Sequence, residues 1–391
     1  MTKKALMAGG GIAGTVAAIA LHRAGWSPRI YEGRAADADE RGAFLTVAVN
    51  GLTALRALDL DPGKLLAAGY PTPTLTLANG AGRRLALLPL GGPTADGTVT
   101  TTIKRLDLYA ALRAAATERG IPIEYGKRLE SFREEPDGVT VTFRDGSTAR
   151  GGLLAGADGI RSRTREILNP GGPAPAYLGL LNAGGFTEGP VDADLDRTPG
   201  LVHMTFGRRA FFGWSVAPDG SVWWFANPPR REPLTGGEYT PASWRAYLLE
   251  LFAGDAAPAA AIIRATPEAL GPWNTDDMPR VPVWHSDRVV LLGDAAHAVS
   301  PSSGQGASMA IEDAVTLGRC VATGELPGAL AGYEQRRRRR VEKVVAFGRR
   351  GNSGKTAGPI GAALRDAMLP LIMKLVHRKG DPAAWILDHQ V

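Results

Sequence analysis

The feature that most constrains this chain is a glycine-rich segment near the N-terminus, which reads Gly9-Gly10-Gly11-Ile12-Ala13-Gly14. An apolar run at 5–8 precedes it, and an alanine-rich run that ends at Gly25 follows it. This order predicts a strand, a tight turn and a helix over about residues 13–24, with a second strand at 28–31. The pattern G-x-G-x-x-G in that context is typical of a parallel α/β unit that binds a dinucleotide.

Each residue of the motif has its own task. Gly9 permits the tight turn, Gly11 lets a pyrophosphate approach the backbone, and Gly14 lets the helix pack closely on the strand. Ile12 and Ala13 begin the helix, where free N–H groups and the helix dipole favour the phosphates. We therefore expect the helix N-terminus to bind a ligand that carries phosphate.

An acidic residue at the end of the second strand completes the pattern. Glu32 follows Gly14 by 18 residues, near the spacing of an acid that binds ribose hydroxyls. The alternative is a glycine-rich turn in an ordinary α/β domain. Strand, helix and acid together favour an adenine dinucleotide, and they leave FAD and NAD open.

The composition limits the class of protein further. Lys3 and Lys4 precede an apolar run, as in a signal peptide, but its glycines and its length, below about 20 residues, argue against an export signal or a membrane span. The one cysteine, Cys320, excludes a disulfide framework, and six scattered histidines suggest no metal site. A net charge of +6 is modest for this length and does not decide between a nucleic acid and an anionic small molecule as partner; we expect no nucleic-acid partner. We expect a soluble, cytoplasmic protein with no metal.

Two later segments each place an acid directly after an apolar strand. The first reads LLAGADGIRSRTR and contains Asp158; the second begins VVLLGDAAH and contains Asp294. Asp294 can accept hydrogen bonds from the hydroxyls of a ribityl chain. The alternative for either acid is a capping role in a turn.

The loop after Asp294 is rich in Pro, Ser and Gly and includes Pro301 and Gly304. A helix is predicted to start near Gly306. The backbone N–H groups from Gly304 through Gly306 to Ala307 can stabilise negative charge on a reduced flavin ring. This loop is therefore predicted to face the ring of a flavin.

In this order the three segments resemble the class A FAD-dependent monooxygenases, the family of para-hydroxybenzoate and salicylate hydroxylases. The resemblance implies that the stretch after Gly293-Asp294 binds the riboflavin part of FAD, and that the Asp158 segment serves both FAD and NAD(P)H. Arg105, in IKRLDLYAAL, matches a family arginine that approaches the FAD pyrophosphate; the alternative is a helix-cap charge. No second G-x-G-x-x-G occurs, which speaks against a separate NAD(P)H domain.

The resemblance also implies the fold class. We expect an α/β protein with a Rossmann-like FAD-binding domain, a mostly antiparallel β-sheet substrate domain and a C-terminal helical region. The FAD-binding domain is predicted to be discontinuous and to comprise residues 1–72, 99–172 and 281–325. The substrate-binding domain would comprise residues 73–98 and 173–280, and the helical region residues 326–391.

The implied activity is a monooxygenation. Non-covalent FAD would be reduced by NADPH or NADH and react with O₂ to a C4a-hydroperoxide, which transfers one oxygen atom to an aromatic or polycyclic, polyketide-like small molecule. Three alternatives stay open: a flavin-dependent halogenase, an epoxidase, and an FAD-binding protein without catalysis. The cofactor carries the chemistry, so no catalytic side chain is assigned.

The middle of the chain holds the candidates for a substrate pocket. From Tyr177 to about Arg280 short apolar runs alternate with turns, which predicts antiparallel strands. Aromatic side chains gather there, and most of them are expected to form core. The candidates for a flat, apolar pocket over the flavin are His203, Phe212, Trp214 and Trp224.

Two basic segments near the C-terminus are given no functional role. The run Arg336–Arg340 has no interleaved aromatic residues, so we interpret it as a solvent-exposed helix face rather than a nucleic-acid patch. FGRRGNSGKT, which ends at Thr356, resembles a phosphate-binding loop, but it lacks the first glycine and follows a helical rather than a strand pattern.

Overall fold

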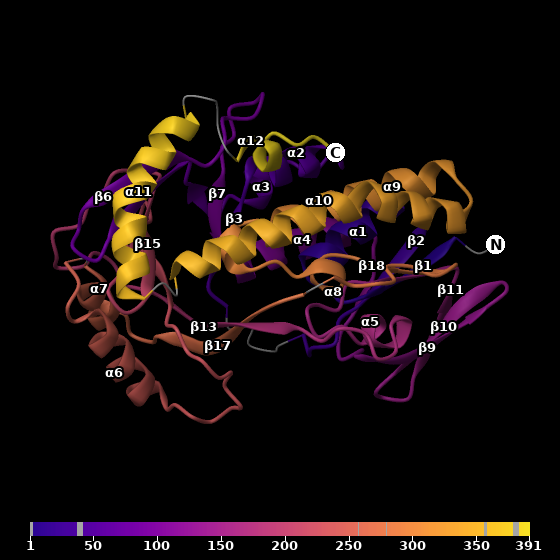
Figure 1. The fold of residues 1–391 in the computed structure, drawn as a ribbon. Coiled ribbons are helices and arrows are strands. Elements are labelled where there is room, and N and C mark those ends of the chain that lie inside the picture. The colour runs from indigo at the N-terminus through magenta and orange to yellow at the C-terminus, as the bar shows by residue number, and fades with distance from the viewer. Residues whose placement is uncertain (1–2, 37–41, 257, 279, 356–357, 378–382) are drawn as a thin grey trace.

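The computed structural model describes residues 3–36, 42–256, 258–278, 280–355, 358–377 and 383–391. A parallel sheet of five strands lies in one half of the molecule, in the order β18-β12-β1-β2-β8 (Figure 1). Its strands are β1 (Lys4–Ala8), β2 (Ser27–Tyr31), β8 (Ile123–Glu124), β12 (Leu153–Gly156) and β18 (Val289–Leu291). The first two strands and helix α1 (Ile12–Arg23) lie within about one residue of the sequence prediction.

Both faces of this sheet are covered, which explains why its strands are apolar at successive positions. Ala5 and Met7 face a core shared with α1, and Leu6 and Ala8 face a second core on the other side. The first core also includes α2 (Val49–Arg56), α3 (Pro62–Leu65), α4 (Arg105–Glu118) and α9 (Gly306–Thr323). The second face is covered by an antiparallel sheet of β9 (Leu129–Glu135), β10 (Gly138–Phe143) and β11 (Thr148–Gly151), beside α5 (Arg163–Leu168).

A larger, mostly antiparallel sheet forms the other half, in the order β17-β13-β16-β15-β14-β5-β6. Only the β14–β5 pair is parallel among its described pairings. Its strands are β5 (Thr74–Asn79), β6 (Arg84–Pro89), β13 (Ala176–Phe186), β14 (Leu201–Phe206), β15 (Phe211–Val216), β16 (Val222–Asn227) and β17 (Leu270–Asp277). Helices α6 (Pro241–Phe252) and α7 (Ala259–Ala265) pack on one face of it.

A small sheet joins the two halves. It consists of β3 (Phe44–Val47), β7 (Thr101–Lys104) and β4 (Tyr70–Pro71), in that order across the sheet. Phe44 and Tyr70 of this sheet contact Trp223 of the large sheet, with ring centroids 5.8 and 5.0 Å apart. The fold class predicted from the sequence is confirmed, whereas the exact domain boundaries stay a prediction.

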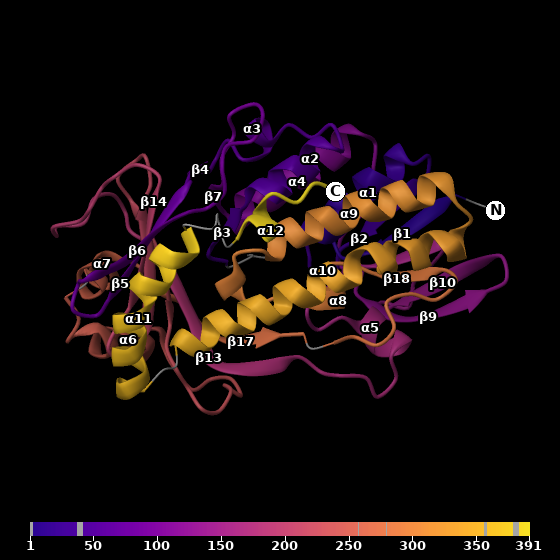
Figure 2. The same ribbon diagram turned by 45° about the horizontal axis from the view of Figure 1, so that its top comes forward.

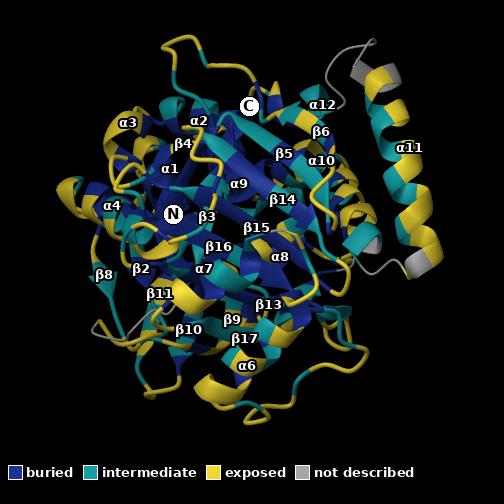
Figure 3. Cartoon of the chain, turned by 90° about the vertical axis from the view of Figure 1, so that its left-hand side faces the viewer, coloured by how far each residue is buried: buried dark blue, intermediate teal, exposed yellow. Residues whose placement is uncertain are grey.

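Helix α10 (Leu326–Lys355) runs from beside α9 to the large sheet and so spans both halves (Figures 1 and 2). Helix α11 (Pro359–His377) follows and packs along β6, with its outer side exposed (Figure 3). The short α12 (Ala384–Leu387) returns to the first half, where Ile386 and Leu387 join the core. Among the described residues, no helix is both long and apolar enough to cross a membrane.

Candidate active site

The glycine-rich turn joins β1 to α1 and is packed without spare room on its inner side. Gly9 has φ +104°, and a Cβ on Gly14 would lie 2.0 Å from the Gly9 carbonyl oxygen. At Gly11, by contrast, a Cβ would meet only the Tyr109 hydroxyl, at 3.9 Å. The turn is therefore closed at Gly9 and Gly14 and open at Gly11, which is the position where a pyrophosphate approaches the backbone.

Glu32 and Arg105 both lie close to this opening. Glu32 follows β2, and its carboxylate accepts hydrogen bonds from the backbone N–H of Gly10 at 2.7 Å and of Arg34 at 2.9 Å. Arg105 begins α4, is exposed, and donates to the Tyr109 hydroxyl at 2.6 Å. Because Tyr109 is also the nearest group to Gly11, the arginine lies beside the open side of the turn.

The three glycine- and acid-containing segments of the sequence meet at this edge of the parallel sheet. A Cβ on Gly9 would lie 2.4 Å from the Ala157 carbonyl oxygen, and one on Gly293 would lie 2.8 Å from the Cβ of Ala13. The turns after β1, β12 and β18 are thus direct neighbours. Ligands of open α/β sheets bind at this carboxyl edge of the strands.

The two acids of the later segments have different surroundings. Asp158 accepts a hydrogen bond from Ser162 Oγ. It also accepts two from Thr164, one from the backbone N–H and one from Oγ1, each at 3.0 Å. Asp294, the first residue of α8 (Asp294–His297), is exposed. Within the described part of the chain its carboxylate has no hydrogen-bond or ion-pair partner. Asp158 holds the start of α5, whereas Asp294 has its oxygens available for a ligand.

We predict that Asp294→Ala weakens FAD binding about 10- to 100-fold, the effect of losing one charge-assisted hydrogen bond. Asp158→Ala should instead lower the melting temperature, because it removes bonds to the first turn of α5 at a cost of about 1 kcal/mol. FAD dissociation constants from flavin fluorescence, with melting curves of the apoproteins, measure both effects. Equal dissociation constants for the two variants would contradict this assignment.

The loop predicted to face a flavin ring forms a short 3₁₀ turn, η1 (Pro301–Ser303), before α9. Gly304 ends this turn in the left-handed conformation, with φ +62°. Pro301 and Gly304 are exposed, and Gly306 and Ala307 are half-buried at the first turn of α9. The loop therefore presents its backbone to the outside of the core, where a planar group can approach it.

The prediction that Arg336–Arg340 form a solvent-exposed face is wrong for three of the five residues, because Arg337 is buried and the side chains of Arg338 and Arg340 are only 17% and 10% exposed. Arg337 is 1% exposed and donates to Glu312 at 2.5 Å and to Asp313 at 2.7 Å. Arg340 donates to both carboxylate oxygens of Glu312 at 2.8 Å. The run is buried where it crosses two adjacent acids of α9, because buried carboxylates need cations beside them.

This buried ion cluster supports the turn that carries Asp294. The second carboxylate oxygen of Asp313 accepts from the backbone N–H of Gly293 at 2.9 Å and contacts His297 Nε2 at 2.5 Å. Burial alone would raise the pKa of Asp313, but His297 and Arg337 lower this pKa to about 2. An ionised Asp313 thus fixes the residue that precedes Asp294, and it was not singled out from the sequence.

The four candidates for a substrate pocket lie on the face of the large sheet that packs against α6 and α7. Phe212 and Trp224 are 0% exposed and stack on each other at 5.5 Å, and Phe212 also contacts Phe252 of α6. His203 stacks on Trp214 with ring centroids 4.0 Å apart. The structure therefore does not support a pocket role for these side chains, which form a helix–sheet core.

Aromatic side chains on the opposite face point away from α6 and α7. Because side chains alternate along a strand, Phe211, Trp223 and Phe225 lie on this second face. On this face Trp223 contacts Phe44 of β3, with ring centroids 5.8 Å apart. We refer to Phe211, Trp223 and Phe225 as the aromatic face.

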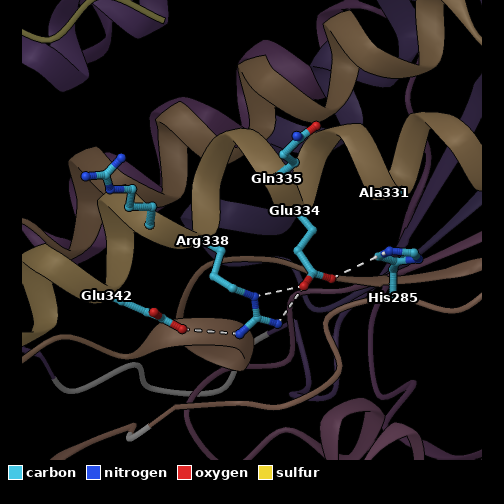
Figure 4. Close-up of a pocket in the computed structure, with 7 residues that line it drawn as sticks. His285, Ala331, Glu334, Gln335, Arg338 and Glu342 are labelled. Carbon is cyan, nitrogen blue, oxygen red and sulfur yellow. Dashed lines mark hydrogen bonds and ion pairs between the residues drawn. The ribbon is translucent and has the colours of Figure 1, made fainter.

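A separate cavity of about 410 Å³ lies on the outer side of α10 (Figure 4). Glu334 pairs there with Arg338 at 2.7 Å and lies 3.6 Å from His285, and Glu342 also pairs with Arg338. Arg338 in addition donates to the carbonyls of Val281 and Pro282. The carboxylates of Glu334 and Glu342 are thus both paired with Arg338, which leaves neither of them free for a cationic ligand.

Comparisons with known proteins agree with this site. The sequence matches the family described as FAD binding domain over residues 2–348. It is 34% identical to the aurachin C monooxygenase/isomerase of Stigmatella aurantiaca, over 94% of each chain. It is 30% identical to the 6-hydroxynicotinate 3-monooxygenase of Bordetella bronchiseptica, over 86% of this chain and 88% of that one.

Solved structures show the same fold. The structure of HpxO from Klebsiella pneumoniae in complex with FAD and uric acid has a TM-score of 0.82 and 27% identity, with 96% of this chain and 95% of that chain covered. The chain belongs to the FAD-binding-domain family and, within it, to the class A flavoprotein monooxygenases. It is an FAD-dependent monooxygenase, so the alternative of an FAD-binding protein without catalysis is set aside.

Proposed function

We propose that this enzyme inserts one oxygen atom from O₂ into a small aromatic or polycyclic substrate, with NADPH or NADH as reductant. The observation that carries the proposal is the meeting of three turns at one sheet edge, with Gly11 open and with an Asp294 carboxylate that no described residue pairs with. FAD supplies the electron transfer and the oxygen activation when it is bound. The sequence relatives named as monooxygenases support the same reaction class.

We assign the cofactor contacts as follows. The pyrophosphate lies over Gly11 at the start of α1, with Arg105 beside it, and Glu32 binds the adenosine ribose. Asp294 binds the ribityl hydroxyls. The N–H groups at Gly304–Ala307 stabilise negative charge on the ring. The role of Asp158 toward NAD(P)H stays a prediction, because its carboxylate already binds Ser162 and Thr164.

The substrate is proposed to lie between the loop that contains Pro301 and the aromatic face of the large sheet. Flat, apolar side chains bind a planar ring and exclude water, which keeps the oxygen transfer from being lost as hydrogen peroxide. This proposal assigns the pocket to the aromatic face instead of to His203, Phe212, Trp214 and Trp224. The pocket is still expected to be flat and apolar. We also propose a cytoplasmic location, where the buried Cys320 stays reduced.

The purified protein is expected to be yellow, with FAD that heat or acid releases. Incubation under ¹⁸O₂ with NADPH or NADH and a panel of phenols, quinolones and polyketide-like rings should give a product with one ¹⁸O atom, detected by mass spectrometry. A halogenase would instead need a halide, and an epoxidase would yield an epoxide from an alkene. A colourless protein that FAD cannot reconstitute, or oxidation without ¹⁸O in the product, would contradict the proposal.

A further inference from the structure

One lysine at the C-terminal end of α10 lies between the loop at Pro301 and the aromatic face. A methyl group on Gly351 would contact Ser302 at 3.5 Å, and Asn352 donates to Ser300 Oγ at 2.8 Å. Three residues further, Lys355 Nζ donates to Asn227 Oδ1 of β16 at 2.6 Å. The end of α10 therefore contacts the loop and places the ammonium group of Lys355 against the large sheet.

The ammonium of Lys355 lies over aromatic rings rather than beside an acid. Its Nζ is 4.1 Å from the ring centroid of Phe211 and 5.9 Å from that of Phe225. In the described ranges of the chain, no carboxylate lies within ion-pair distance of it. Burial lowers the pKa of Lys355 to about 7, the direction expected for a cation without a counter-ion.

Other charged groups near this end of the chain have partners. Arg349 pairs with the fully buried Asp277, and Arg365 pairs with Asp366 at 2.7 Å. Asn227 is oriented by its own donation to Asn182 Oδ1 at 2.8 Å, so that its carbonyl oxygen accepts from the lysine. An ammonium has three donors, and Asn227 takes one of them.

We propose that Lys355 binds an ionised oxygen of the substrate, and that the substrate is an aromatic acid: a ring that carries a carboxylate, phenolate or enolate. This inference rests on the proposed function and names its substrate class. A cation in apolar surroundings is costly unless an anion pairs with it, and the ring of such a substrate would lie against Phe211 and Phe225. The lysine belongs to the segment FGRRGNSGKT, for which a role as a phosphate-binding loop is rejected on sequence grounds.

The competing explanation is that Lys355 only fastens the end of α10 to β16 through Asn227. The two explanations differ in their effect on ligands. If Lys355 only fastens the helix, its replacement changes the affinity for acids and for neutral compounds equally. If Lys355 binds the substrate, its replacement weakens the binding of acids more than that of neutral compounds. The experiment therefore compares each acid with its neutral counterpart on the FAD-loaded enzyme.

The probes are benzoate and benzamide, 4-hydroxybenzoate and its methyl ester, and 4-hydroxyquinoline-2-carboxylate and its amide. Each is titrated while the visible spectrum of the bound flavin is recorded. For at least one pair, we expect the acid to bind the wild-type enzyme about tenfold or more tightly than the neutral compound. Lys355→Met should reduce this ratio to about one, and Lys355→Arg should restore part of it.

Lys343→Met is the matched control, because Lys343 lies on the same helix and over a ring, that of Trp385 at 3.8 Å, but away from the large sheet. This variant should keep the wild-type ratio. If Lys355→Met fails to fold, the inference is tested by the ratio of the wild-type enzyme and by the ratio of Lys355→Arg. A wild-type ratio near one, tighter binding of the neutral members, or no response to any probe by FAD-loaded enzyme overturns the inference. Failure to bind FAD would instead contradict the proposed function.

Discussion

Gly11→Val is expected to weaken FAD binding at least about 100-fold while the apoprotein keeps its fold and its melting temperature. Within the protein a Cβ at this position meets only the Tyr109 hydroxyl, at 3.9 Å. The larger side chain would instead occupy the place of the pyrophosphate, whose charge-assisted bonds to backbone N–H groups contribute about 1.5–3 kcal/mol each. Flavin fluorescence titration and circular dichroism measure affinity and fold separately.

Gly14→Ala is the matched comparison from the same motif. Its Cβ would lie 2.0 Å from the Gly9 carbonyl oxygen, so α1 must move away from the turn. We expect the free energy of unfolding to fall by about 3 kcal/mol, already without FAD. Wild-type FAD affinity in Gly11→Val would show that the pyrophosphate does not pass over Gly11.

Arg337→Met is expected to lower the free energy of unfolding by about 3–5 kcal/mol, the cost of leaving a buried acid without its partner. Glu312 and Asp313 are both 0% exposed, and Arg337 binds each of them. FAD affinity should fall as well, because Asp313 also binds the backbone N–H of Gly293. Urea unfolding followed by circular dichroism gives the stability of the apoprotein.

Arg339→Met provides the control for this prediction, since Arg339 belongs to the same run and is exposed. This variant should change the free energy of unfolding by no more than about 0.5 kcal/mol. If Arg337→Met is as stable as Arg339→Met, the buried cluster does not stabilise the fold. A loss of FAD affinity without a loss of stability would show that the cluster acts on the Gly293 turn alone.

The parallel sheet and its turns could be predicted because their signals are local. Glycines, apolar runs and the acids at positions 32, 158 and 294 follow one another along the chain, and each strand–turn–helix unit encodes its own geometry. A difference between Asp158 and Asp294 could be expected from the sequence, but its structural reason could not. It depends on whether Ser162 and Thr164 reach back to the carboxylate, which only the folded loop determines.

The burial of Phe212, Trp214 and Trp224 against α6 and α7 could not be predicted from the sequence, for a different reason. Alternation along β15 and β16 defines two faces but not which of them the helices cover. That depends on α6 and α7, which follow later in the chain and return over Phe212 and Trp224. In the same way, the burial of Arg337 depends on Glu312 and Asp313, which lie one helix earlier.

The order of strands in the parallel sheet has a consequence for how the protein is made. The sheet pairs β1, at residues 4–8, with β12, and β12 with β18, at residues 289–291. The Gly293 turn further needs Asp313, which is neutralised by Arg337. The N-terminal glycine turn is synthesised first, whereas its neighbouring turns follow much later, first the one at Ala157 and then the one at Gly293. Such long-range pairing folds slowly and leaves apolar strands uncovered meanwhile, so we expect the complete cofactor site to form only after α10 has been made.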